Sequence, residues 1–146
     1  MSGSLDLEHL PEELSLIHLN DNEFSGTVNL TKLPRGLSGI LLCKNHLNGT
    51  VDLTCLPDTL QELFLNSNDF SGTLDLTMLP QSATSFWFDF NRFEGTIRVE
   101  HFPESLRNLG LEGNNFTDDI VLGDAPDDFE CLAVGKDEIV RDLHGE

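Results

Sequence analysis

Basic residues are scarce in this chain of 146 residues. Eight Lys and Arg stand against 26 Asp and Glu, which gives a formal net charge of −18. A protein that binds nucleic acid or an anionic membrane needs Lys and Arg to meet the phosphates. The composition therefore argues against both targets, whereas a basic protein partner is compatible with it.

Long apolar runs are missing as well. None reaches the roughly 20 residues that a membrane-spanning helix requires. The first ten residues, MSGSLDLEHL, contain neither the basic start nor the apolar stretch of a secretory signal. We therefore expect no membrane insertion and a cytoplasmic location. Secretion stays open if a leader is missing from this sequence, because Asn29, Asn48 and Asn115 each begin an Asn-x-Thr sequon.

Motifs for chemistry are also lacking. The sequence has no glycine-rich phosphate cradle, no zinc-ligand spacing and no paired-carboxylate cleft. The nearest approach to a nucleophile and base is Cys43 with His18, and no third group is placed to orient the histidine. We therefore expect no enzymatic activity, no cofactor and no metal site. The odd number of cysteines, three, suits a reducing compartment.

A strict period of 23 residues is what the sequence does contain. The prolines follow it without an insertion, at Pro11, Pro34, Pro57, Pro80, Pro103 and Pro126. A second ladder keeps the same step, at Asn22, Asn45, Asn68, Asn91 and Asn114, with Asp137 in the sixth place. Periods of 20 to 50 residues are typical of solenoids, in which each unit is one structural repeat.

Each unit also repeats one apolar pattern. In the third unit, the motif L-x-x-L-x-L-x-x-N-x-F runs from Leu60 to Phe70. This pattern resembles the leucine-rich repeat family, in its 23-residue class and similar to plant-type and trypanosomatid-like protist repeats. The resemblance implies an α/β-class, strand-rich, right-handed solenoid with a parallel concave sheet, short convex strands or turns, and a short C-terminal capping helix.

The period divides the chain into one domain of six repeats, residues 1–146. The expected repeats are about 5–28, 29–51, 52–74, 75–97, 98–120 and 121–137, followed by a cap at 138–146. Leu63 and Leu65 lie two residues apart, so both point to the same face of a strand. Stacked copies bury these residues in a continuous core. The later equivalents include Leu109 with Leu111, and Leu132 with Val134.

The asparagine ladder has a separate explanation. A turning backbone leaves amide and carbonyl groups without sheet partners, and such groups are costly when they are buried. An Asn side chain both donates and accepts hydrogen bonds. We therefore expect each Asn to bond its own coil and the next one.

The residues between the inward positions of the strands face outward on the concave side of the solenoid, and we expect the binding surface there. Exposed apolar side chains that are contiguous usually mark interaction sites, although packing of these side chains on one another is the alternative. The expected anchors are Leu41, Phe64, Trp87 and Phe90. The expected polar surround is His18, Glu62, Asn66, Asp89 and Glu112. Beside them, Gly110, Gly113, Ala133 and Gly135 predict a bare region that could seat a protruding element of a partner.

The sequence therefore predicts a non-enzymatic protein-protein interaction module. Family members are generally interaction scaffolds, so the resemblance implies the same role. The alternative is a structural or self-assembling protein that pairs through the apolar stripe or the uncapped first coil. A glycan- or ligand-binding wall is a lesser alternative. We expect a monomer or weak homodimer.

Overall fold

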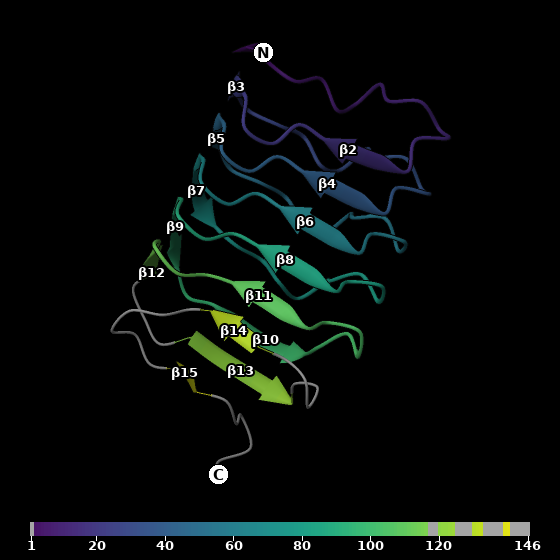
Figure 1. Cartoon of the computed structure of the whole chain (residues 1–146). Coiled ribbons are helices and arrows are strands. Elements are labelled where there is room, and N and C mark those ends of the chain that lie inside the picture. Colours follow the sequence, from purple (N-terminus) through teal and green to yellow (C-terminus); the bar gives the residue numbers. More distant parts are fainter. Residues whose placement is uncertain (1, 117–119, 125–129, 133–138, 141–146) are drawn as a thin grey trace.

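The chain folds into a solenoid of stacked coils with parallel strands, as seen in a computed structural model (Figure 1). The structure describes residues 2–116, 120–124, 130–132 and 139–140. Each complete coil consists of a first strand, a sharp turn, a second strand and a longer return segment that leads to the next coil. The predicted solenoid of parallel strands is confirmed.

The first strands form a six-stranded parallel sheet, called here the front sheet. Its members are β2 (Leu16–His18), β4 (Gly39–Leu41), β6 (Glu62–Phe64), β8 (Ser85–Trp87), β11 (Asn108–Gly110) and β14 (Glu130–Leu132). The second strands form the corner sheet. Its members are β1 (Ser2–Gly3), β3 (Glu23–Gly26), β5 (His46–Gly49), β7 (Asp69–Thr73), β9 (Arg92–Gly95) and β12 (Asn115–Phe116). A third sheet contains β10 (Arg98–His101), β13 (Ile120–Asp124) and β15 (Ile139–Val140).

The 23-residue period appears directly in the register of the front sheet. Ile40 pairs with Leu63, and Leu63 with Phe86. The last step differs, because Leu109 pairs with Cys131 and Gly110 with Leu132, a spacing of 22 residues (131 minus 109). The prediction that Leu132 occupies the inward column of Leu109 is therefore wrong by one residue.

Every second residue of the front sheet points into the core. Ile40, Leu63, Phe86 and Leu109 are fully buried. Full burial of such a side chain stabilises the fold by about 1.5–3 kcal/mol. In the middle coils the core also contains aromatic rings, and Phe93 lies 6.1 Å from Phe70 in a stacked arrangement. One continuous cluster runs through the stacked coils, as the repeated pattern predicts.

The asparagine ladder closes the turn after each front strand. The Nδ2 of Asn68 donates to the carbonyl of Leu65 in its own coil (3.2 Å) and to that of Leu42 in the preceding coil (3.0 Å). Its Oδ1 accepts the amide of Leu47, also in the preceding coil (3.0 Å). The bridge therefore runs to the preceding coil instead of the next one. The same three bonds recur at Asn45, Asn91 and Asn114. Asp137 lies outside the described residues.

The proline ladder marks a second turn in each coil. The amide of Leu37 donates to the carbonyl of Pro34 (3.2 Å), and that of Leu60 to the carbonyl of Pro57 (3.1 Å). Each bond closes a four-residue turn that redirects the return segment toward the next front strand. The leucine at the end of the turn is fully buried in both coils.

The second strand of each coil lies at the corner itself. Strand β7 contains Ser71 and Gly72, and Leu74 and Leu76 are buried in the irregular return segment that follows. Gly72 has φ of +85°, and an added Cβ would lie 2.7 Å from Thr50 Cγ2 of the preceding coil. Glycine is needed there for both reasons.

Two further expectations about the fold need correction. The described residues contain strands and turns but no helix, so this part of the chain is all-β and not α/β. Ile139 and Val140, predicted in a capping helix, form strand β15 paired with β13. The rest of the expected cap lies outside the described residues.

The ladder makes a quantitative prediction about stability. Asn68→Ala leaves the amide of Leu47 without its acceptor. It also removes one of two donors from the carbonyls of Leu42 and Leu65, which keep the bonds from Asn45 and Asn91. We expect the free energy of unfolding to fall by about 2 kcal/mol, measured by urea denaturation. Asn48→Ala, at an exposed position of β5, is the control and should change it by less than about 0.5 kcal/mol. Equal effects of the two substitutions would contradict the role of the ladder.

Candidate functional site

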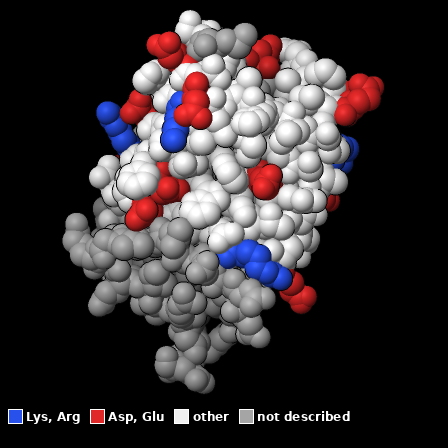
Figure 2. Space-filling view, viewed as in Figure 1, with Lys and Arg blue, Asp and Glu red and all other residues white. Residues whose placement is uncertain are grey.

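The face of the front sheet turned away from the core, called here the outer face, carries a column of large apolar residues. Leu41 pairs with Phe64, and Phe64 pairs with Trp87, so the three lie on adjacent strands. The rings of Phe64 and Trp87 meet edge to face, with centroids 6.4 Å apart. All three side chains are half-buried. Figure 2 shows that much of this side of the molecule is uncharged, with separate acidic patches.

Trp87 and Phe90 both lean onto the following coil. A Cβ added to Gly110 would collide with the ring of Trp87, and a Cβ added to Gly113 would collide with the ring of Phe90. The bare region predicted at these two glycines is therefore covered by the aromatic rings. Ala133 and Gly135 lie outside the described residues. The rings and the two glycines therefore form one continuous surface, with no bare region between them.

Phe90 has an unfavourable backbone conformation. Its φ is +58°, in the left-handed region, where a bulky side chain is a genuine outlier. The same position of the other coils holds Asp21, Lys44, Ser67 and Gly113, all with φ between 59° and 72°. Phe90 is also 54% exposed. The bulkiest residue in this left-handed conformation, Phe90, therefore occupies an exposed position of the outer face.

The sequence placed Asp89 in the polar surround of the apolar anchors, but the structure buries it. It follows Trp87 by two residues, shares the outer face with it, and is only 8% exposed. Its Oδ1 is buried and has no hydrogen-bond partner. A Cβ on Gly110 would lie 2.7 Å from this oxygen and 3.1 Å from Trp87 Cζ3. The carboxylate and the indole therefore converge above the same glycine.

Asn66 repeats this situation one coil earlier. The coils are joined at this position by the amide of Ser67, which donates to the carbonyl of Asp89 (2.9 Å). The Oδ1 of Asn66 is buried and lacks a partner. In the first coils the same column is satisfied, because Asn20 Oδ1 accepts the amide of Cys43 (2.8 Å). The two unsatisfied acceptors thus occur together, beside the aromatic residues.

The electrostatics of the site are unfavourable for a carboxylate. Burial raises the pKa of Asp89, and the charge of Glu112 on the next coil raises it further. A hydrogen bond from its own backbone amide partly opposes this rise in pKa. Glu112 is half-buried and lies close by, since the amide of Phe90 donates to its carbonyl (2.9 Å).

The remaining predicted residues lie at the margin. His18 is exposed on the edge strand β2, three strands from Trp87. Glu62 is exposed on β6, with its carboxylate toward β4. The sequence reasoning missed Leu16, which is exposed on β2 and lies over Gly39. The sequence does contain a signal for Leu16, because a glycine, Gly39, follows it at the same position one coil later, as Gly110 follows Trp87.

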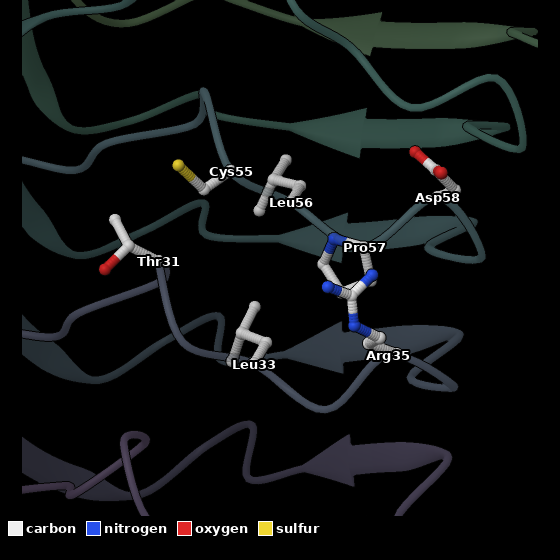
Figure 3. Close-up of a pocket in the computed structure, with 7 residues that line it drawn as sticks. All are labelled: Thr31, Leu33, Arg35, Cys55, Leu56, Pro57 and Asp58. Atoms are coloured by element: carbon white, nitrogen blue, oxygen red, sulfur yellow. The ribbon is translucent and has the colours of Figure 1, made fainter.

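Clefts also occur on the return segments. One, of about 330 Å³, lies between two stacked return segments (Figure 3). Its walls are Thr31, Leu33, Arg35, Cys55, Leu56, Pro57 and Asp58. Another, of about 700 Å³, lies along the first coil, between residues 4–9 and 26–29. Neither contains a residue of the aromatic column.

The described residues show neither an activated Cys43 nucleophile nor a cluster of metal ligands. Burial and the charge of Asp21 raise the pKa of the Cys43 thiol, which disfavours its thiolate. Within residues 2–116 and the three short described segments, no three His, Cys, Asp or Glu side chains group as metal ligands do. No helix in the described part of the chain is long and apolar enough to cross a membrane.

Comparison of the chain with protein-family models and with curated proteins found no match.

The strain at Phe90 predicts an unusual mutational effect. Phe90→Asn should leave the free energy of unfolding unchanged or raise it by up to about 1 kcal/mol, because Asn tolerates the left-handed conformation. Ser67→Asn, at the same position of the preceding coil, is the matched control. Chemical denaturation measures both. A loss above 1 kcal/mol for Phe90→Asn alone would show that its ring is structural.

The position of Asp89 predicts a pH-dependent cost. Because its pKa is raised in the folded state, the protonated form favours folding, and stability falls as pH rises from the ordinary Asp pKa through the raised one. Asp89→Asn should therefore raise the free energy of unfolding at pH 7 by about 1 kcal/mol. This advantage should shrink toward pH 4. Urea denaturation of both proteins at the two pH values measures the difference, and a pH-independent difference would contradict the assignment.

Proposed function

We propose that this chain is a non-enzymatic leucine-rich repeat protein that binds a partner protein with its outer face. The observation that carries the proposal is the contiguous column of Leu41, Phe64 and Trp87, continued by Phe90, on a face where the solenoid needs no apolar residue. A soluble fold gains nothing from an exposed phenylalanine in a strained backbone conformation. Strain of this kind is concentrated at functional sites.

The family assignment is supported by the positions that each repeat uses. The leucine positions of the motif are inward and buried, and the asparagine closes the turn after the front strand. These are the structural roles that the pattern L-x-x-L-x-L-x-x-N implies. The strands and turns of the described residues are compatible with a strand-rich solenoid of this kind.

A protein partner fits this surface better than a small ligand does. Small molecules bind in concave pockets that enclose most of their surface, and the clefts described above lie on the return segments. The outer face instead offers rigid aromatic side chains, which are favoured as anchors in protein interfaces. The half-buried Glu112 and the exposed Glu62 lie beside them, as the polar rim of an interface does.

Self-assembly is the second candidate, and the first coil favours it. Strand β2 is an edge of the front sheet and pairs only with β4 among the described residues. Leu16 on this strand is 48% exposed. Edge strands are templates for pairing with another chain. A second copy could therefore join at the first coil.

A capture experiment separates these candidates. The variant with both Phe64→Ala and Trp87→Ala should lose the partners that the wild-type chain captures from cell extract, by at least about tenfold, because two anchors of ~2 kcal/mol or more are removed. Met78→Ala is the matched control, since Met78 is 59% exposed on a return segment. Quantitative mass spectrometry of the captured proteins measures the loss.

The outcome against the proposal is equal capture by the double variant, provided that it unfolds cooperatively like the wild type. Light scattering of all three proteins over a range of concentrations tests self-assembly. A mass that rises with concentration, and does so equally in the double variant, favours pairing at the first coil.

A further inference from the structure

Two buried acceptor atoms on the outer face have no hydrogen-bond donor. The Oδ1 of Asp89 and that of Asn66 are both buried without a hydrogen-bond partner. Elsewhere among the described residues, the Lys and Arg ion pairs use other carboxylates, those of Glu8, Asp21 and Asp69. A buried carboxylate is costly unless a cation pairs with it. Asp89 accepts a hydrogen bond from its own backbone amide, but none of these ion pairs includes it.

The surroundings of Asp89 specify the missing group. Asp89 and Asn66 occupy the same position of adjacent coils, roughly 4.8 Å apart at strand spacing. Both atoms accept hydrogen bonds, so the missing group must carry several donors. The indole of Trp87 lies beside the carboxylate above Gly110, and aromatic faces attract cations. Glu112 adds negative charge from the next coil.

We propose that the outer face contains a receptor for the guanidinium group of an arginine on the partner protein, formed by Asp89, Asn66 and Trp87. This inference rests on the proposed function and names the chemistry of its partner. The planar guanidinium carries five donors, bridges neighbouring acceptors and stacks on aromatic rings. A lysine ammonium is a compact charge that cannot stack in this way. The net charge of −18 would steer a basic segment toward the chain.

The arrangement also predicts movement of Trp87 on binding. Asp89 Oδ1 is covered in the free chain, where it lies beside the indole. A guanidinium that reaches this oxygen must displace the ring from its position over Gly110. Trp87 is the only tryptophan in the sequence, so its fluorescence reports on this site alone.

The direct test uses the whole chain and a short peptide with blocked ends, Gly-Gly-Arg-Gly-Gly. Titration to millimolar concentration should change the Trp87 fluorescence in a saturable way. The same peptide with citrulline, a neutral isostere of arginine, should bind at least about tenfold more weakly, as should the lysine peptide. Asp89→Asn should weaken binding of the arginine peptide about tenfold or more. Glu23→Gln, which removes one exposed charge from the corner sheet, should leave the affinity unchanged.

Two results would overturn the inference. One is the absence of a saturable change with the arginine peptide, and the other is equal binding by wild type and Asp89→Asn. Capture from extract keeps this inference distinct from the proposed function. If Asp89→Asn captures the same partners as wild type while the Phe64 and Trp87 double variant loses them, the outer face binds a protein but not through an arginine at Asp89.

Discussion

The hydrogen bonds of the asparagine ladder are the constraint on which the solenoid depends. A coil that turns sharply after three strand residues leaves backbone groups that the front sheet cannot satisfy. Asn68 satisfies three of them at once and joins two coils in doing so. These bonds hold successive coils in register, because each Asn bonds carbonyl and amide groups of the coil before it.

This constraint separates structural from functional residues. The ladder and the inward positions fix the path of the backbone, and they place no demand for apolar side chains on the outer face. The column of Leu41, Phe64 and Trp87 and the strained Phe90 occupy positions where the fold makes no demand for them. Burial and the charge of Glu112 raise the pKa of Asp89, so we expect its ionised form to destabilise the free chain. We therefore assign these side chains to the proposed binding surface.

Much of this arrangement was predictable from spacing, and the failures have physical causes. The period and the alternation of apolar residues predicted the coils, the buried positions and the outer column. They could not predict that Trp87 leans onto Gly110, because periodicity gives the face of a side chain but not the neighbour it covers. The burial of Asp89 follows from that lean. The 22-residue step at Cys131 was hidden because Leu132 fits an unbroken period equally well.

We infer that Trp87 lies on the binding surface of the solenoid. Collisional quenching of its fluorescence by acrylamide should therefore be partial in the free chain, and a captured partner should protect it markedly. If acrylamide does not quench Trp87 in the free chain, or if the bound partner leaves the quenching unchanged, Trp87 does not lie on that surface.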